Sequence, residues 1–220
     1  MRALVVGASG GIGAALVAGL AANGADVTGL SRRLDGMDLT DEAAIERVLG
    51  GLSGAYDRII VATGALELDG IGPEKSLRGV KGEAVLRQFA LNALGPVLVL
   101  KHCVRLMPKS LPCHFAALSA RVGSIGDNAL GGWYGYRAAK AALNQMLHTA
   151  AIELGRSHPQ AVVAALHPGH VGTALSLKYG GNLPAASPEE AAANLLHVLD
   201  GLTPAQSGGF FDYAGKTIPW

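Results

Sequence analysis

The chain has 220 residues, of which 50% are hydrophobic and 16% charged, and its formal net charge is +1. This length suits one domain built around a single core. The composition excludes a disordered chain. The near-neutral charge, with no run of like charges, gives no electrostatic basis for binding nucleic acid or an acidic membrane surface.

The cysteine content and the start of the chain favour a reducing compartment. The two cysteines, Cys103 and Cys113, stand outside any metal-type or redox-type spacing, so a secreted disulfide fold is not expected. The first 25 residues share small and apolar residues with signal peptides, but glycines interrupt them, and strand, turn and helix explain them better. No apolar run approaches the length of a membrane span. We therefore expect a soluble, cytoplasmic protein without nucleic-acid or membrane partners.

Short apolar runs alternate with longer helical patterns from the first residues onward. The expected strands lie at 2–6, 26–30, 58–62, 113–118, 161–166 and 208–213. The expected helices lie at 12–23, 41–49, about 83–107, about 132–156 and 188–200. Apolar runs without alternation fit strands buried on both faces, and repeated strand–helix–strand order is typical of a doubly wound, mostly parallel α/β sheet. The whole chain, 1–220, is expected to form one domain.

Local signals set several of these boundaries. Residues 40–42 and 187–190 each carry a capping side chain followed by carboxylates, the pattern of a helix start. Pro96 is expected to kink the long middle helix and Pro108 to end it. The interval 31–57 leaves room for one helix and at most a stub of a further strand near 36–38.

A glycine-rich stretch, "VVGASGGIGAAL", follows the first strand and opens the first helix. Glycine allows a tight turn and close approach of the backbone to a pyrophosphate, whose charge then lies at the helix N-terminus. Tight turns also use glycine without any ligand, which is the alternative reading. The position in the first strand–helix unit favours a dinucleotide site. The residues predicted to bind the cofactor here are Gly7, Ser9, Gly10, Gly11, Ile12 and Gly13.

The end of the second strand indicates which dinucleotide is bound. An acidic residue there would bind the ribose hydroxyl of NAD, whereas arginine accommodates the 2′-phosphate of NADP. The sequence has Ser31, Arg32 and Arg33 at this place, with no carboxylate at the strand tip. The alternative is a solvated surface arginine pair. The sequence predicts NADP(H).

Two tyrosines precede a lysine in "GGWYGYRAAKAAL". Tyr136 and Lys140 are four residues apart on a predicted helix and share one face, whereas Tyr134 has Ala138 at that spacing. A nearby ammonium lowers the pKa of a phenol, and a phenol so tuned can protonate a developing alkoxide. The alternative is an amphipathic helix with Tyr and Lys at its edge, and a bare Tyr-x-x-x-Lys would favour that alternative.

The glycine loop and the Tyr-x-x-x-Lys pair about 120 residues later together resemble the short-chain dehydrogenase/reductase superfamily over essentially the whole chain. The segment from residue 118 to 144 resembles the C-factor-type and sniffer-like carbonyl reductase branch. The resemblance implies a single Rossmann domain with a seven-stranded sheet, an NAD(P)(H) cofactor and a catalytic Asn–Ser–Tyr–Lys set. It also implies a homodimer or homotetramer formed through the helices at 83–107 and 132–156.

Further site residues are implied by the same resemblance. Asn92, in "ALNALGPVLVL", matches the asparagine that holds a water in a proton relay through the lysine. Asp38 and Leu39, in "DLTD", would flank the adenine. The stretch "HPGHVGT" matches the segment that lines the nicotinamide, through Pro168, Gly169, Val171 and Thr173.

Two departures from the family pattern stand out. The slot of the family's active-site serine holds Ala120, with Ser119 one residue earlier; in a regular strand Ser119 would point to the opposite face. Ser124 is the other nearby hydroxyl. The family's Asn-Asn-Ala-Gly turn is replaced by a segment in which Ala62, Thr63 and Gly64 would border the adenosine, with Thr63 partly replacing the missing asparagine.

Other candidates have simpler explanations. His167 and His170 flank a Pro-Gly pair without a Cys or carboxylate cluster, so loop histidines near a cofactor are preferred to a metal site, and no metal is expected. Trp133 either lines the substrate entrance or caps the helix start. Residues 174–190 are expected to form a short lid.

These observations predict an NADP(H)-dependent oxidoreductase that interconverts a small-molecule carbonyl and an alcohol. Tyr136 is the expected general acid/base, Lys140 the residue that holds the ribose, Asn92 the organiser of the relay and Ser119 the substrate-orienting hydroxyl. The alternative is a non-catalytic NADP-binding regulatory or signalling protein on the same fold, which Ala120 favours.

Overall fold

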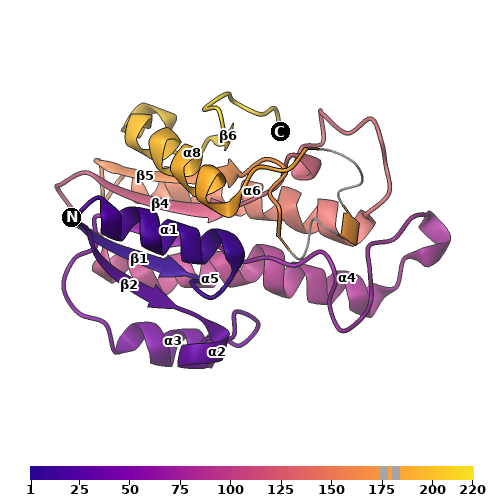
Figure 1. The fold of residues 1–220 in the computed structure, drawn as a ribbon, viewed down its shortest axis with the longest axis horizontal. Helices are drawn as coiled ribbons and strands as arrows, with labels where there is room; N and C mark the ends of the chain where they lie inside the picture. Colours follow the sequence, from indigo (N-terminus) through magenta and orange to yellow (C-terminus); the bar gives the residue numbers. More distant parts are fainter. Residues whose placement is uncertain (174–177, 180–183) are drawn as a thin grey trace.

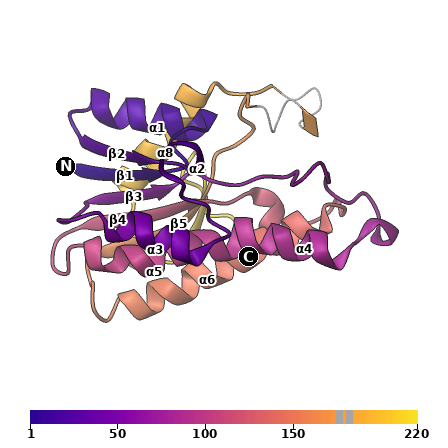
Figure 2. The same cartoon turned by 90° about the horizontal axis from the view of Figure 1, so that it is seen from below.

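A parallel sheet of six strands lies at the centre of the structure, with helices on both faces (Figures 1 and 2). The strands run in the order β2-β1-β3-β4-β5-β6, and every neighbouring pair is parallel. They are β1 (Arg2–Val6), β2 (Asp26–Leu30), β3 (Arg58–Val61), β4 (Cys113–Leu118), β5 (Ala161–His167) and β6 (Phe210–Asp212). The computed structural model describes residues 1–173, 178–179 and 184–220.

The helices form one layer on each side of the sheet (Figure 2). They are α1 (Gly11–Ala22), α2 (Arg32–Asp35), α3 (Glu42–Gly50), α4 (Gly82–Phe89), α5 (Gly95–Cys103), α6 (Tyr134–Leu154) and α8 (Pro188–Gly201). Helices α1 and α8 pack together on one face, while α3, α5 and α6 cover the other. Short 3-10 turns lie at Leu77–Gly79, Val104–Leu106, Arg121–Gly123 and Pro204–Gln206.

Successive strand residues enter opposite cores, as the pleat requires. In β1, Leu4 and Val6 join the core beneath α3, α5 and α6, while Ala3 and Val5 join the core beneath α1 and α8. Both faces are therefore covered, which explains why the strands read as continuous apolar runs rather than alternating ones. The expected doubly wound α/β class is confirmed.

The predicted helix starts at residues 40–42 and 187–190 are also confirmed. The Asp41 carboxylate accepts a hydrogen bond from the Ala43 N–H at 3.0 Å, and the Ser187 hydroxyl accepts one from Glu190 N–H at 3.0 Å. Each side chain satisfies a backbone donor that the first helical turn leaves without a partner.

The expected seventh strand is wrong: the described residues form six. The chain after β2 enters the four-residue helix α2, and Gly36 then turns it in the left-handed conformation at φ 66°. The carboxylate of Asp38 accepts hydrogen bonds from the N–H and hydroxyl of Thr40, at 2.9 and 2.7 Å. This local turn ends just before α3, so no length of chain is left to pair with β2.

The expected single helix at 83–107 is also not regular. A five-residue π-helical segment, Ala90–Leu94, separates α4 from α5, and Pro96 lies in the first turn of α5, so the irregularity stands next to the proline expected to disturb this helix. The stretch Gly82–Leu106 is long and apolar enough to cross a membrane by length and composition alone, contrary to the sequence-based expectation. Here α5 packs against α3 and α6, as a core helix does.

Candidate active site

The glycine loop lies between β1 and α1 at the carboxyl edge of the sheet, at the point where β1 has neighbours on both sides. The N–H groups of Gly7 and Ala8 donate to the Leu30 carbonyl, at 2.8 and 3.0 Å. Gly7 has a φ of 91°, and a Cβ at Gly13 would overlap the Gly7 carbonyl oxygen. Only glycine fits these two positions, and the turn leaves the N-terminus of α1 open with Gly10 as N-cap and no side-chain cap.

Three separate segments border this loop. A Cβ at Gly7 would lie 2.7 Å from the Ala62 carbonyl oxygen, so the segment after β3 lies directly against it. The Cγ2 atom of Thr173 would lie 3.3 Å from a Cβ at Gly11. Ser9, Gly10 and Ile12 belong to the same loop. The structure thus brings together three of the segments predicted to bind the cofactor, those after β1, β3 and β5.

Ser31, Arg32 and Arg33 follow β2 directly and lie beside the loop through the Leu30 carbonyl. The buried Ser31 hydroxyl accepts the Leu34 N–H at 3.2 Å and so caps α2. The Arg32 side chain is 79% exposed, and its guanidinium lies 4.0 Å from the Asp38 carboxylate. The two arginines are therefore exposed and do not pack in the core, and the Arg32 guanidinium is accessible to a phosphate.

Two further predicted cofactor-binding residues, Leu39 and Thr63, are described by their surroundings: Leu39 by its backbone carbonyl and Thr63 by its side-chain hydroxyl. A Cβ at Gly95 would lie 2.7 Å from the Leu39 carbonyl oxygen, so Gly95 lets α5 approach this segment closely. The Thr63 hydroxyl is buried and has no hydrogen-bond partner among the described residues. It does not tie neighbouring strands in the way expected from the sequence.

Asn92 sits in the π-helical segment and is fully buried. Its side-chain oxygen accepts the Ala65 N–H at 3.1 Å, and its amide nitrogen donates to the Ala65 carbonyl at 2.9 Å and to the Gln88 side chain at 2.6 Å. A Cβ at Gly64 would lie 3.0 Å from the Asn92 oxygen and 3.3 Å from Lys140 Nζ. Gly64 thus lets the segment after β3 reach both predicted catalytic side chains.

Tyr136 and Lys140 lie one turn apart on α6, with Lys140 Nζ 5.8 Å from the centroid of the Tyr136 ring. Lys140 is buried, and its Nζ donates to the Leu118 carbonyl at 2.8 Å. Burial raises the pKa of Tyr136 to about 12 and lowers the pKa of Lys140 to about 7. The expected lowering of the Tyr136 pKa is therefore not found in the chain itself, where desolvation dominates.

Ser119 and Ala120 lie at the end of β4. The Ser119 hydroxyl donates to the Asn144 side-chain oxygen at 2.6 Å, and this pair is buried beneath α6. Ser119 borders the cavity in front of Tyr136, but its hydroxyl is engaged away from it, as strand alternation predicted. Ser124 accepts the Asp127 N–H and does not line the cavity. Ala120, in the serine slot, also lines the cavity and offers no hydroxyl.

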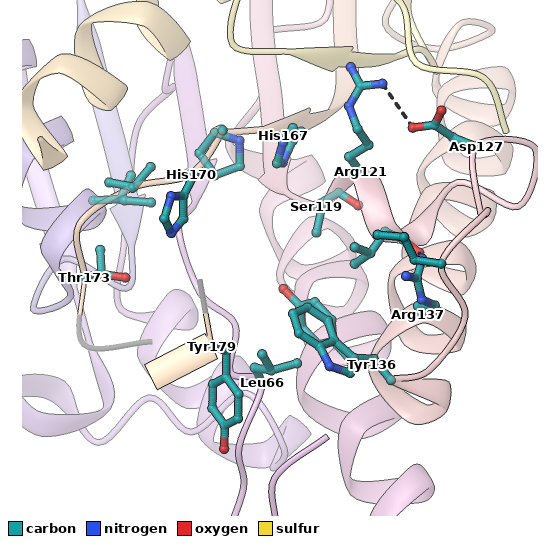
Figure 3. Close-up of a pocket in the computed structure, with 18 of the residues that line it drawn as sticks. Leu66, Ser119, Arg121, Asp127, Tyr136, Arg137, His167, His170, Thr173 and Tyr179 are labelled. Atoms are coloured by element: carbon teal, nitrogen blue, oxygen red, sulfur yellow. Dashed lines mark hydrogen bonds and ion pairs between the residues drawn. The ribbon is translucent and has the colours of Figure 1, made fainter. Parts of the chain in front are cut away.

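A cavity of about 430 Å³ lies in front of Tyr136 (Figure 3). The figure shows Tyr136 directing its hydroxyl toward the end where Ser119 lies, with Leu66 and Tyr179 below. One side is formed by residues predicted to bind the cofactor. They are Ile12, Pro168, Gly169, Val171 and Thr173. The other side combines apolar residues with the ion pair between Arg121 and Asp127, whose atoms are 3.1 Å apart.

His167 and His170 both line this cavity. Burial lowers the pKa of His167 to about 4, so its ring is neutral near pH 7. The His170 ring nitrogen Nδ1 lies 3.1 Å from the Pro184 carbonyl. Both histidines thus lie beside the expected cofactor position. The expected lid falls partly on 174–177 and 180–183, outside the described residues, while Tyr179 and Lys178 contact the Glu67 carboxylate.

Sequence reasoning missed the residues that hold this site together. The Gln88 side chain bridges Asn92 and the Leu66 carbonyl, the latter at 3.0 Å. Glu74 accepts the Gly135 N–H with its carboxylate at 3.1 Å, at the start of α6. The signal for Gln88 was its position one turn before Asn92; nothing in the local sequence pointed to Glu74, which lies 61 residues from Gly135.

Comparisons with known proteins agree with this geometry. A family model described as enoyl-(acyl carrier protein) reductase matches residues 7–198. A 1-hydroxy-2-glutathionyl-2-methyl-3-butene dehydrogenase from a Rhodococcus species is 31% identical over 99% of this chain and 98% of its own. The C-signal protein of Myxococcus xanthus is 36% identical over 61% of this chain and 77% of its own. A Burkholderia multivorans short-chain dehydrogenase/reductase solved with bound NADP superposes over 100% of this chain and 99% of its own, with a TM-score of 0.81 and 25% identity.

Proposed function

Because the chain belongs to the short-chain dehydrogenase/reductase family and is an oxidoreductase of that family, we propose that it reduces a carbonyl to an alcohol with NADPH, or runs the reverse reaction. The observation that carries this proposal is the convergence of Tyr136, Lys140 and Asn92. The side chains of Asn92 and Lys140 both lie against Gly64, and the Tyr136 ring, whose centroid is 5.8 Å from Lys140 Nζ, lines the cavity beside them.

The residues around the glycine loop fit a dinucleotide. A Cβ at Gly7 or Gly13 would collide with the protein's own backbone, so these glycines let the loop close tightly and leave the N-terminus of α1 open to a pyrophosphate. Thr63 offers a buried hydroxyl without a partner among the described residues. The exposed guanidinium of Arg32 is placed to bind a 2′-phosphate. The NADP found in the Burkholderia structure is consistent with this choice.

The chemistry then divides between cofactor and protein. NADPH supplies a hydride to the carbonyl carbon of the substrate. Tyr136 donates its proton to the carbonyl oxygen, because its raised pKa keeps the phenol protonated near pH 7. Lys140 holds the ribose and restores the Tyr136 proton, and Asn92 fixes the segment after β3 through its paired bonds to Ala65. Reversal of these proton movements gives alcohol oxidation.

An assay of NADPH oxidation against aldehydes, ketones and diketones tests the proposal. Wild type is compared with Tyr136→Phe, and Tyr134→Phe serves as the matched control because that tyrosine is 41% exposed and does not line the cavity. Loss of about a hundredfold or more in kcat for Tyr136→Phe alone is expected. Equal activity of the two variants would contradict the role of Tyr136. A preference for NADH over NADPH would contradict the roles of Arg32 and Arg33.

The second candidate is a non-catalytic NADP-binding regulatory or signalling protein. Ala120 in the serine slot favours it, and one relative bears the name C-signal. Tight NADPH binding by fluorescence titration, combined with no turnover across the carbonyl panel, would select this candidate instead.

A further inference from the structure

Trp133 occupies the wall of the cavity, between two tyrosines. Its ring centroid lies 6.5 Å from that of Tyr136 and 6.5 Å from that of Tyr179, with interplanar angles of 73° and 79°. Both are edge-to-face arrangements, which aromatic rings prefer. The indole therefore has a fixed orientation next to the proposed proton donor.

The backbone at Trp133 is strained. Gly131, Gly132 and Trp133 are three consecutive residues in the left-handed conformation, with φ of 65°, 67° and 53°. Within the described ranges, Trp133 and Asp69 are the two non-glycine residues with positive φ. A third glycine would adopt this conformation without cost, so the turn geometry does not explain why tryptophan stands here.

Two charged residues hold this turn from opposite sides. The Arg137 guanidinium donates to the carbonyls of Gly132 at 3.0 Å, Gly131 at 3.1 Å and Val122 at 3.1 Å. Glu74 accepts the Trp133 N–H with its backbone carbonyl at 2.6 Å and the Gly135 N–H with its carboxylate at 3.1 Å. Arg137, on α6, thus binds carbonyls of the turn, and Glu74, in the 65–80 segment, accepts N–H groups at the end of the turn and the start of α6.

Apart from the Arg137 guanidinium, which binds three carbonyls, the remainder of this wall is mostly apolar or paired. Its apolar members are Leu66, Val122, Ala129 and Leu130. The Arg121 guanidinium is already paired with Asp127 at 3.1 Å and Asp212 at 3.2 Å. A group that packs on this wall is best matched by a flat, uncharged hydrocarbon surface.

We propose that Trp133 is a specificity-determining residue that selects carbonyl substrates with an aromatic or fused-ring group next to the carbonyl, and that Arg137 and Glu74 are positioning residues for its indole. The inference rests on the proposed function of the same site. It extends that function by naming the substrate class, which the lid sequence alone does not select.

Paired substrates test the proposal. Benzaldehyde is compared with heptanal, which has the same number of carbon atoms, in wild type, Trp133→Gly and Trp133→Leu. Trp133→Gly relieves the backbone strain and is expected to fold, and Tyr134→Ala is the control. We expect kcat/KM for benzaldehyde to fall about tenfold or more in both Trp133 variants, mainly through KM, with less than about a twofold change for heptanal. Equal changes for both aldehydes, or none, would overturn the proposal.

Arg137→Lys tests the positioning role, because lysine keeps the charge but lacks the fork that reaches three carbonyls. We expect a raised KM for benzaldehyde with an unchanged NADPH affinity. Rescue of the wild-type KM by lysine would show that charge alone matters and would overturn this role.

A binding measurement separates this inference from the proposed function. Trp220→Phe leaves Trp133 as the one tryptophan of the chain, since the sequence contains two. In the NADP⁺ complex, benzaldehyde is expected to quench its fluorescence, whereas heptanal is not. Quenching without turnover would overturn the proposed reaction alone, and turnover without quenching would overturn the role of Trp133 alone. Neither quenching nor turnover would overturn both.

Discussion

Tyr136 and Lys140 lie on adjacent turns of one helix, and burial moves their pKa values apart, that of Tyr136 up to about 12 and that of Lys140 down to about 7. For reduction the phenol must carry its proton, and a raised pKa keeps it there. For oxidation it must first lose that proton. We therefore expect kcat for oxidation to rise from about pH 6 to about pH 8, whereas kcat for reduction should not rise, because Lys140, which returns the proton to Tyr136, loses its own charge near pH 7.

The measurement is a pair of pH–rate profiles for one carbonyl and its alcohol. Lys140→Met is expected to lower kcat in both directions, because it removes the amine that exchanges a proton with Tyr136. Tyr134→Phe should leave both profiles unchanged. Parallel profiles for the two directions would exclude Tyr136 as the titrating group.

The serine slot makes a second prediction at the residue scale. The hydroxyl of Ser119 is committed to Asn144, whereas Ala120 lines the cavity with no donor to offer. Ala120→Ser would add a donor to the oxygen that gains charge, and the removal of such a donor typically costs about 10²–10³ in kcat. We expect Ala120→Ser to raise kcat by about tenfold, as measured with saturating NADPH.

Ser119→Ala is the matched variant. It should change kcat by less than about threefold and lower the free energy of unfolding by about 1 kcal/mol, since Asn144 loses a buried partner. Strong loss of activity in Ser119→Ala, together with no gain in Ala120→Ser, would restore Ser119 to the catalytic role that the sequence predicted for it.

At the scale of elements, α6 begins without a cap of its own. Trp133 at its N-cap makes no side-chain bond, and the first turn holds no acidic residue. Glu74 supplies the missing acceptor from a distant segment. Glu74→Ala should therefore lower the free energy of unfolding by about 1 kcal/mol in urea denaturation, and Glu74→Gln by less, because the amide oxygen still accepts the Gly135 N–H.

Glu153→Ala is the control for this prediction. Glu153 is exposed in the last turn of α6, where a negative charge opposes the helix dipole, so its removal should be neutral or slightly stabilising. Equal losses in Glu74→Gln and Glu74→Ala would indicate that charge, rather than the accepted hydrogen bond, supports the helix start.

Elements with strong local signals were predictable from the sequence, and those set by distant contacts were not. The buried strands and the caps at Asp41 and Ser187 follow from apolar runs and capping residues. Pro96 signalled an irregularity in the middle helix, but not its π-helical form around Asn92, which depends on bonds from Asn92 to Ala65 across the fold. The start of α6 depends on Glu74 in the same way. The seventh strand was expected from the family resemblance, but the chain between α2 and α3 is too short to form it.

At the scale of the whole molecule, the carboxyl edge of the parallel sheet brings the site together. Gly7, Gly64 and Ala120 follow three different strands and His167 ends a fourth, so residues far apart in the sequence meet at this edge. Glycine spacing and the Tyr136–Lys140 pair could identify this edge from the sequence. The direction of a side chain at a strand end could not be predicted in the same way. A shift of one position moves a side chain to the opposite face, which is the difference between Ser119 and Ala120.

The buried Lys140 also links the stability of the whole molecule to pH. Its pKa is lowered to about 7 in the folded chain and returns to its ordinary value on unfolding, so the unfolded state binds more protons between these values. Stability from this group therefore rises with pH above about 7. The gain between about pH 7 and about pH 9 should be about 2 kcal/mol.

Urea unfolding of wild type and Lys140→Met at both pH values measures this gain. The buried thiols of Cys103 and Cys113, whose pKa values burial raises to about 12 and about 11, act in the opposite sense near pH 9. Both proteins carry them, so the difference between the two proteins isolates Lys140. The difference between the two free energies of unfolding should shrink as the pH rises. Burial of Lys140 costs less free energy once its amine is neutral, whereas methionine does not titrate. A difference independent of pH would mean that Lys140 stays charged in the folded chain, held by a counter-charge that lies outside its bond to Leu118.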